Sequence, residues 1–562
     1  MTLTRELIIN GRYLNLPIKD NGPRRTMRLF VDGVEVRAFE IELAAADDVD
    51  HWMFTEVDEW RGHTLVVTLE PQPVVLDEKF HTQSAAARLA ADALDVIAID
   101  DAIRDGDSHY RETLRPQFHF TSRRGHLNDP NGLFWHDGEY HLFYQHDPYS
   151  IHSSCNKAWG HAVSPDLIHW HELPVALHAD EEGNKWSGSG LVDWHNVTGL
   201  ARDGQPPLLL YYTATGFSAQ HLEPGSFVQS IAVSYDRGRT WTPYAGNPII
   251  PTLTPGNRDP LVFWHEPTQR WLMTLFVGQP ESWYNRGNRC EAQILSSTDL
   301  IHWQFESIVP GFHDCPILAE LPIEGTEGDT RWIMHCANLR YQLGTFDGHV
   351  FTPETDLITG QWGDCAYAAQ FYNHAPNGRK IQIAWARTTS PGMPFDQAMC
   401  VPCEVSLVNT SAGLRARWTP VPELERLRGP AQIVPPQTLA DGETIDCLRG
   451  QHLDLNFDIA AGTAQQVVLQ IRGVEFVVDV IARTLAVEDK QIALHLTDGR
   501  LQLRLLVDRI LIEVFADEGL SYAPLALIPA IDDDCVTVQA RGGDAELKSF
   551  TGYELTSIWP QP

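Results

Sequence analysis

The sequence lacks the features that mark membrane proteins and nucleic-acid binders. No run of about 18 apolar residues occurs, so we expect no membrane-spanning helix. Basic residues are few, with 42 Lys and Arg against 74 Asp and Glu, and the formal net charge is −32. Because nucleic acids and anionic membrane surfaces repel such a chain, we expect neither as a partner.

Cysteine is scarce and scattered. The nine cysteines are an odd number, and Cys400 and Cys403 form a close pair without a second pair at zinc-binding spacing. Residues 1–19 show no apolar core of the kind found in signal peptides. We therefore expect a reducing, cytoplasmic location. The sequence also has no HExxH pair, phosphate-binding glycine loop or dinucleotide fingerprint, so we expect no metal and no cofactor.

Strand-like alternation of apolar and polar residues marks both ends of the chain. It runs through residues 27–43, where Asp32-Gly33 is a pair typical of hairpin turns, and through residues 501–515. We therefore predict an N-terminal β-sandwich-like accessory domain over residues 1–112. A C-terminal β-sandwich is predicted over residues 441–562.

Two segments with a composition of their own are expected to connect the larger units. Residues 411–440 are rich in proline and arginine, and we predict a linker there. The alanine-rich stretch 84–103 is predicted to form a helix or a connecting segment.

The central part of the chain repeats itself. Asp129-Pro-Asn-Gly-Leu-Phe-Trp-His136 recurs, one residue shorter, as Asp259-Pro-Leu-Val-Phe-Trp-His265. Ser164-Pro-Asp-Leu-Ile-His-Trp170 recurs as Ser297-Thr-Asp-Leu-Ile-His-Trp303 and, more loosely, as residues 234–241. Segments of about 50 to 65 residues that contain short strands and close on a Trp-bearing turn are typical of propeller blades.

Five such segments predict a five-bladed β-propeller over residues 113–410 in an all-β protein. They begin near Asp129, Ser187, Asp259, Asp314 and Asp364. The first strand of each propeller blade faces the central channel, so acids at equivalent places in different blades converge there. One turn-forming Asp per blade explains the same repeat, and the pattern leaves both interpretations open.

The first of these acids, Asp129, lies in the most distinctive stretch of the chain, Gly125–Trp135. A backbone stiffened by Pro130 and made bendable by Gly132 is suited to hold one carboxylate in a fixed place. The same string is typical of an Asx-type turn that opens a hairpin. Taken alone, the stretch favours the turn.

Six ordered blocks of the sequence resemble glycoside hydrolase family 32, which contains invertases, levanases, inulinases and related β-fructosidases. The blocks are Phe118–Leu133, His141–Gln145, Trp159–Trp170, Trp186–Ser189, Arg258–Pro260 and Asp314–Pro316. The similarity extends to Val507–Phe515 in the C-terminal part. It implies a five-bladed propeller followed by a β-sandwich, a small carbohydrate as partner and a retaining reaction at the anomeric carbon of fructose.

The resemblance also implies a role for each of three acids. Asp129 would be the nucleophile that forms a fructosyl-enzyme. Asp259 would bind fructose hydroxyl groups and stabilise the oxocarbenium-like transition state, with Arg258 keeping it ionised. Asp314 would be the general acid and then the base that activates water. A retaining pair needs carboxyl groups about 5 to 5.5 Å apart, and the acid needs a pKa raised by burial or by a nearby negative charge.

Further residues are assigned to sugar binding by the same resemblance. Asn128 and Gln145 would donate hydrogen bonds to the sugar and orient the nucleophile. Trp186 and Ser187 would line the far side of the pocket, and Trp385 would form another wall.

The chain departs from the family pattern at three places. Asp314 stands where the family has Glu, and one fewer methylene draws the carboxyl group back by about 1.5 Å. His126 replaces a Trp, and Ser154-Cys-Asn-Lys157 replaces Trp-Gly-Asn-Met. The two pocket changes, His126 among them, exchange apolar walls for polar groups and predict a substrate with a polar or charged substituent or an unusual leaving group. Lys157 itself is expected to be a solvated surface residue.

We therefore expect a cytoplasmic glycoside hydrolase of β-fructofuranosidase type that releases fructose from a fructoside or a short fructo-oligosaccharide. One alternative is a fructosyltransferase of the same fold, in which a sugar hydroxyl replaces water as the acceptor. Another is a catalytically impaired sugar-binding protein, an alternative that the shortened Asp314 and the altered pocket support.

Overall fold

A computed structural model describes residues 2–44, 48–71, 94–152, 156–216, 218, 227–254, 256–278, 290–496 and 499–559. Nearly all regular structure in them is β-strand, so the predicted all-β class is confirmed. The described helices are short 3₁₀ turns at Asp58–Trp60, Gly106–Ser108, Glu266–Thr268, Pro376–Gly378, Pro422–Leu427 and Asp517–Gly519. None of these helices has the length or apolar character needed to cross a membrane.

The N-terminal part forms two small antiparallel sheets around a shared core. One sheet has the order β1-β6-β3-β4 and the other β5-β2-β7. The strands are β1 (Leu3–Ile8), β2 (Tyr13–Ile18), β3 (Arg25–Val31), β4 (Val34–Ile41), β5 (His51–Glu56), β6 (Thr64–Pro71) and β7 (Ala98–Asp100). Asp32-Gly33 is the predicted two-residue hairpin turn, since Val31 pairs with Val34. The first half of the segment predicted at 84–103, up to residue 93, lies outside the described residues.

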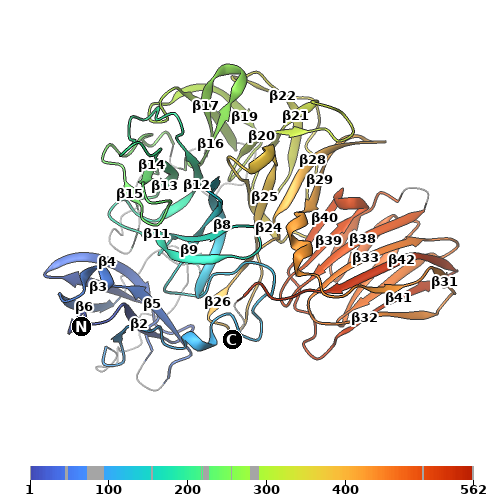
Figure 1. Ribbon diagram of the computed structural model, residues 1–562, viewed down its shortest axis with the longest axis horizontal. Coiled ribbons are helices and arrows are strands. Elements are labelled where there is room, and N and C mark those ends of the chain that lie inside the picture. The colour runs from blue at the N-terminus through green and yellow to red at the C-terminus, as the bar shows by residue number, and fades with distance from the viewer. Residues whose placement is uncertain are drawn as a thin grey trace.

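Five further sheets follow one another between residues 125 and 420, which we call the five-sheet region. Their strands are β8–β11 with β26 (Gly125–His136, Glu139–Asp147, Ala158–Ser164, His171–Leu177, Phe395–Asp396), β12–β15 (Lys185–Val192, Leu208–Ala214, Val228–Ser234, Thr242–Pro243), β16–β19 (Arg258–His265, Arg270–Val277, Glu291–Ser297, Gln304–Pro310), β20–β23 (Ile317–Pro322, Thr330–His335, Tyr341–Phe346, Phe351–Pro353) and β24, β25 and β27–β29 (Ala366–Phe371, Ile381–Ala386, Ala398–Met399, Cys403–Thr410, Gly413–Pro420). The first strands β8, β12, β16, β20 and β24 gather around the middle of this region (Figure 1).

The prediction of a linker over residues 411–440 is wrong for much of that segment. Strand β29 pairs with β28 along its whole length and belongs to the fifth sheet. Trp418 on β29 is buried in the large core beneath it, which explains why this proline-rich stretch is ordered. The segment also contributes β30 (Gln432–Val434) and β31 (Gln437–Leu439) to the next sheet.

The repeated Trp-bearing segments are structural turns. Asp166 and Asp299 each accept backbone N–H bonds from residues two and three positions ahead, at 2.8 to 3.3 Å. Asp236 accepts one from Thr240 at 2.9 Å. Each turn joins the third strand of its sheet to the fourth, so this part of the repeat reflects the architecture.

The C-terminal part consists of two antiparallel sheets that pack around one core. The first has the order β30-β42-β33-β38-β39-β40, with β31 also on β42, and the second has the order β32-β41-β34-β35-β36-β37. The remaining strands are β32 (Thr444–Arg449), β33 (Leu453–Ala460), β34 (Gln466–Ile471), β35 (Val474–Asp479), β36 (Thr484–Val487), β37 (Lys490–Ala493), β38 (Arg500–Val507), β39 (Ile512–Ala516), β40 (Ser521–Leu525), β41 (Cys535–Arg541) and β42 (Ala545–Glu554).

A fully buried ionic cluster joins this C-terminal part to the chain just before β8. Asp508 accepts backbone N–H bonds from Gln117 and Phe118 at 2.8 to 3.0 Å and contacts His119 Nδ1 at 2.9 Å. His119 Nε2 lies 3.1 Å from Glu513. Burial alone would lower the pKa of His119, but its hydrogen bonds to the two carboxylates raise it to about 9. The imidazolium therefore bridges two acids and fixes the strand that follows it.

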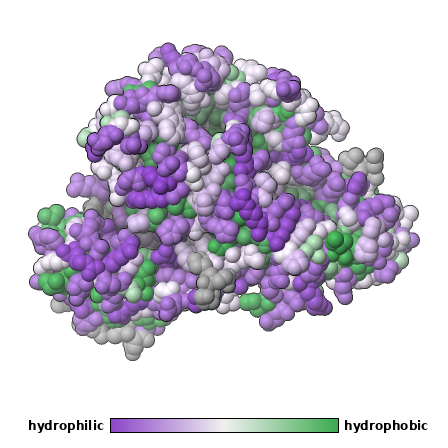
Figure 2. Space-filling model, viewed as in Figure 1, coloured by the Kyte–Doolittle hydropathy of each residue, from purple (hydrophilic) through white to green (hydrophobic). Residues whose placement is uncertain are grey.

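The molecular surface is mainly polar. On the face shown in Figure 2, hydrophilic residues prevail and hydrophobic ones form small separated patches. Large exposed apolar patches mark docking surfaces, and this face shows none.

We expect Asp508→Asn to destabilise the protein by roughly 3 to 5 kcal/mol, because it removes one of the two carboxylates bound to buried His119 and gives the backbone N–H groups of residues 117, 118, 119 and 509 a neutral acceptor in place of a charged one. The midpoint of thermal unfolding measures the effect, and exposed Asp532→Asn is the control. The folded-state pKa of His119 is raised, so its contribution is complete below the unfolded value and is lost as pH rises through about 9. The difference in thermal unfolding midpoint between Asp508→Asn and the control should therefore become smaller above pH 9. A difference that does not change with pH would show that the charge of His119 makes no contribution.

Candidate active site

Each predicted catalytic acid lies where regular strand geometry is interrupted. Asp129 lies in a bulge of β8, Ser187 in a bulge of β12 and Asp259 in a bulge of β16. Asp314 lies in the turn before β20 with a φ of +41°, and Asp259 has a φ of +63°. Bulges re-aim a side chain away from the alternating pattern, and positive φ in a non-glycine residue is a strained conformation that clusters at functional sites.

Hydrogen-bond donors converge on the carboxylate of Asp129. Ser187 Oγ donates to Oδ2 at 2.7 Å, and Gln145 Nε2 lies 3.4 Å from the same oxygen. Asn128 Nδ2 donates to Oδ1 at 3.2 Å. Burial raises the pKa of Asp129, while the hydrogen bonds from Ser187 and Asn128 oppose the rise. Asn128, Gln145 and Ser187 thus lie beside the acid, where the sequence predicted them.

The carboxyl group of Asp259 is almost fully buried. Its backbone N–H donates to Thr213 Oγ1 at 3.0 Å, and its Oδ2 lies 3.6 Å from Arg258 Nε. Burial raises the pKa of Asp259 to about 7, against the opposing charge of Arg258. The ion pair with Arg258 opposes this rise without cancelling it, and the expectation that Arg258 keeps this acid ionised stays a prediction.

Arg258 also binds Asp314. Its Nη2 donates a short hydrogen bond to Asp314 Oδ1, and Tyr367 donates its hydroxyl proton to Asp314 Oδ2 at 2.9 Å. Burial would raise the pKa of Asp314, but the charge and hydrogen bond of Arg258 outweigh it and hold the pKa below its usual value. One guanidinium thus stands between two carboxylates, and the less solvated of them keeps the higher pKa.

Cys315 joins the three acids. Its backbone N–H donates to Asp259 Oδ2 at 2.9 Å, and its thiol contacts Asp129 Oδ2 at 3.8 Å. Because Cys315 directly follows Asp314, this one dipeptide brings all three carboxylates to the same place.

Lys157 is buried, which contradicts the prediction of a solvated surface lysine. Its side chain is 7% exposed, and Nζ donates a short hydrogen bond to Asn128 Oδ1. Burial lowers its pKa to about 8. Residues 154 and 155 of the same block lie outside the described residues. His126 is also buried, with Nδ1 3.5 Å from Asp396 Oδ2.

The two tryptophans predicted to line the pocket each pack against another aromatic side chain. Trp186 packs edge-on against Phe227, with ring centroids 5.3 Å apart. Trp385 packs edge-on against Tyr367 at 6.0 Å and donates a hydrogen bond to Gln397. Trp385 therefore packs behind Tyr367, which in turn binds Asp314.

Sequence reasoning missed Tyr367, Cys315 and Thr213. Tyr367 stands in the short stretch that opens the fifth repeat segment, at the place of the bulge in β24. The bulge is visible only in the strand pairing, so the one signal in the sequence was the place of Tyr367 at the start of the fifth repeat segment. Thr213 lies on the second strand of its sheet, β13, and offered no such signal.

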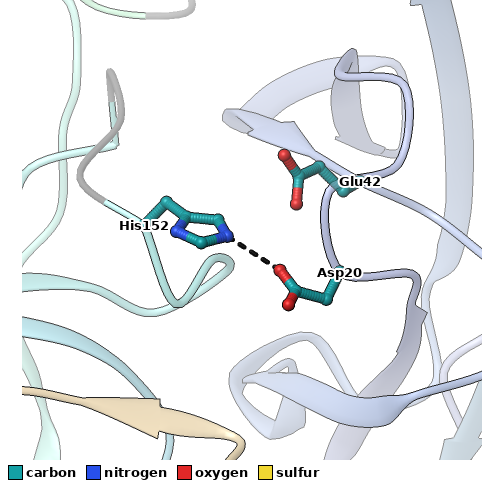
Figure 3. A group of neighbouring side chains, drawn as sticks. All are labelled: Asp20, Glu42 and His152. Carbon is teal, nitrogen blue, oxygen red and sulfur yellow. Dashed lines mark hydrogen bonds and ion pairs between the residues drawn. The ribbon is translucent and has the colours of Figure 1, made fainter. Parts of the chain in front are cut away.

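Two groups among the described residues offer three metal-ligating side chains each, and neither includes the acids above. One is Asp533, Asp534 and Cys535. The other is Asp20, Glu42 and His152, in which His152 points across from the five-sheet region to the N-terminal sheets (Figure 3). His152 Nε2 lies 2.7 Å from Asp20, and Glu42 accepts from Arg24 Nε at 3.2 Å. These contacts describe an ion-pair network between two parts of the chain.

The geometry supports acid–base and nucleophilic chemistry on an uncharged polar ligand. Asp129 is a carboxylate that accepts from three donors. Asp314 is a partly exposed carboxylate, and Cys315, which directly follows it, contacts Asp129. Paired carboxyl groups of this kind, one nucleophile and one proton donor, are the machinery of retaining glycoside hydrolysis.

Comparison with known proteins identifies the family to which the chain belongs. Residues 119–417 match the family model of the glycosyl hydrolases family 32 N-terminal domain. The chain is 32% identical over 508 residues to the levanase of Bacillus subtilis (strain 168), covering 80% of this chain and 72% of the levanase. It is 29% identical over 535 residues to the extracellular exo-inulinase of Aspergillus awamori, covering 80% and 96%. The crystal structure of that exo-inulinase superposes with a TM-score of 0.70 at 25% identity, covering 80% of this chain and 100% of the other. The chain therefore belongs to glycoside hydrolase family 32 and is a glycoside hydrolase.

Proposed function

We propose that the five-sheet region is a five-bladed propeller and that the C-terminal sheets are its β-sandwich. Support comes from four features of the described strands: five successive sheets, antiparallel pairing of neighbouring sequential strands, first strands gathered at the middle, and bulges in four of those first strands. The functional side chains then lie at one end of the channel.

We further propose a β-fructofuranosidase-type retaining reaction. Asp129 attacks the anomeric carbon of a fructosyl unit as the bond to the leaving oxygen breaks, and Asp314 gives that oxygen its proton. Asp314 then takes a proton from water, whose oxygen displaces Asp129 and frees the sugar. The convergence of three donors on Asp129, beside two further carboxyl groups, is the observation that carries the proposal.

Asp314 is bound by Arg258, which holds the pKa of this acid below its usual value. Asp259, with a pKa of about 7, carries a proton in part of the molecules at neutral pH. Sugar hydroxyl groups that bind Arg258 and Asp259 would draw the guanidinium away from Asp314 and raise its pKa. Substrate binding therefore supplies the protonated acid that the first step needs.

The substrate class follows from the polar residues that replace apolar ones. Relatives of the chain are named levanase and exo-inulinase. Here buried Lys157 and His126 stand near the nucleophile, and the acid is one methylene shorter. We propose a fructoside or short fructo-oligosaccharide that differs from plain sucrose or levan in a polar substituent or in the leaving group.

Asp129→Asn should lower kcat on every fructoside by at least on the order of 10⁴-fold, because the amide cannot form the glycosyl-enzyme. The assay is fructose release from sucrose, levan, inulin and substituted fructosides, with Asp137→Asn, on the exposed turn after β8, as control. Product analysis at high substrate concentration separates hydrolysis from transfer, since a transferase accumulates longer saccharides. If wild type binds but releases fructose from none of these compounds, the proposed reaction is refuted.

Asp314→Glu should raise kcat/KM for sucrose relative to the fructoside that wild type prefers. The added methylene advances the carboxyl group by about 1.5 Å, and a displacement of about 1 Å changes rates on the order of 100-fold. Exposed Asp356→Glu serves as control. An unchanged preference would show that the shortened acid does not select the substrate.

Tyr367→Phe should move the alkaline limb of the kcat/KM profile to higher pH. Tyr367 donates to the ionised form of Asp314, so its loss raises the pKa of that acid and keeps the proton on it to higher pH. The pH profile of fructose release measures this, with Tyr553→Phe in the C-terminal part as control. A limb that stays in place would exclude Asp314 as the group that sets it.

A further inference from the structure

Lys157 lies directly before β10, against the first strand of the second sheet. Its carbonyl oxygen accepts from the backbone N–H of Lys185 at 2.8 Å, which fixes the main chain there. The side chain turns inward, and among the residues that the structure describes Asn128 is its one hydrogen-bond acceptor. The ammonium group therefore binds the residue that directly precedes the nucleophile Asp129.

An ammonium group has three donors and no acceptor. The atom of Asn128 that faces Lys157 must therefore be the carboxamide oxygen. The carboxylate of Asp129, which can only accept, requires Asn128 to present Nδ2 on its other side, so the lysine and the acid select the same orientation of the amide.

The orientation of Asn128 fixes the rest of the chain of hydrogen bonds. With its oxygen on Lys157, Asn128 Nδ2 donates to Gln145 Oε1 at 2.8 Å and to Asp129 Oδ1 at 3.2 Å. Gln145 must then present Nε2 on its other side, 2.7 Å from Ser187 Oγ. Ser187 accepts that bond, which leaves its own proton for Asp129 Oδ2 at 2.7 Å. Every donor in the chain consequently points toward the nucleophile.

The charges around Lys157 come from several elements. Asp129 on β8 and Asp147 at the end of β9 are the carboxylates that attract it. His126 on β8 and His146 on β9 also lie within reach of its charge, and burial lowers the pKa of each to about 4, so both are neutral at neutral pH. A positive charge here opposes the effect of burial on Asp129.

We propose that Lys157 is a positioning residue of the nucleophile: it holds the hydrogen-bond chain Asn128–Gln145–Ser187 in the direction that ionised Asp129 requires, and its charge favours that ionised form. The inference rests on the proposed role of Asp129 in fructoside hydrolysis. It gives the departure from the family pattern at this position a function, because a methionine there supplies neither a donor nor a charge.

Two variants separate the direction of the chain from the charge. Lys157→Met removes both, while Lys157→Gln keeps an N–H that can bind Asn128 Oδ1 and removes the charge alone. We expect Lys157→Met to lower kcat/KM by about 10- to 100-fold and Lys157→Gln by less, because displaced catalytic groups cost rates of this order. Both should move the acid limb of the profile upward by about one pH unit, since an opposite charge no longer favours ionised Asp129.

Lys380→Met is the matched control, because Lys380 is also largely buried and lies just before β25 with Glu320 as its charged neighbour. It should leave the acid limb in place. An acid limb unchanged in both Lys157 variants would overturn the proposal and leave Lys157 as a space-filling residue. If Lys157→Met fails to fold, as judged by its thermal unfolding midpoint, the acid limb of Lys157→Gln decides alone. Failure of the proposed function is distinct, because wild type itself would then release no fructose.

Discussion

The active site depends on interruptions of regular β-strand geometry, because these interruptions direct single side chains toward a common centre. An unbroken strand sends successive side chains to opposite faces and leaves none directed along the strand toward a common centre. Bulges at Asp129, Ser187 and Asp259 interrupt three first strands at corresponding places, and the turn at Asp314 does the same before a fourth. Acids far apart in sequence meet because each strand is irregular at the same level.

Electrostatic asymmetry then gives similar carboxyl groups different properties. Half-buried Asp129 is surrounded by three donors, whereas buried Asp259 is bound chiefly by the backbone N–H of Cys315 and by the guanidinium of Arg258. Arg258 is shared by two acids and stays with the more exposed Asp314. A ligand that competes for Arg258 would change the proton distribution of the whole set.

The sequence predicted much of this arrangement, and its failures have physical causes. The repeated Asp-Pro strings located Asp129 and Asp259, and the ordered blocks located Asp314, because these signals are local. The contacts of Lys157 with Asn128 and of Tyr367 with Asp314 join residues far apart in the sequence, which no local pattern encodes. Residues 411–440 looked like a linker because proline disfavours strands, but the burial of Trp418 against the fifth sheet outweighs that tendency.

The cluster of His119, Asp508 and Glu513 bears on how the enzyme's parts depend on one another. His119 stands six residues before β8, the strand that carries the nucleophile, while its two acids come from the far end of the chain. A chain cut before the C-terminal sheets would deprive His119 and three main-chain N–H groups of their carboxylate acceptors and would uncover the apolar core around Phe118. The C-terminal part therefore stabilises the strand that carries the nucleophile. Removing it as a separate domain would also unfold the five-sheet region.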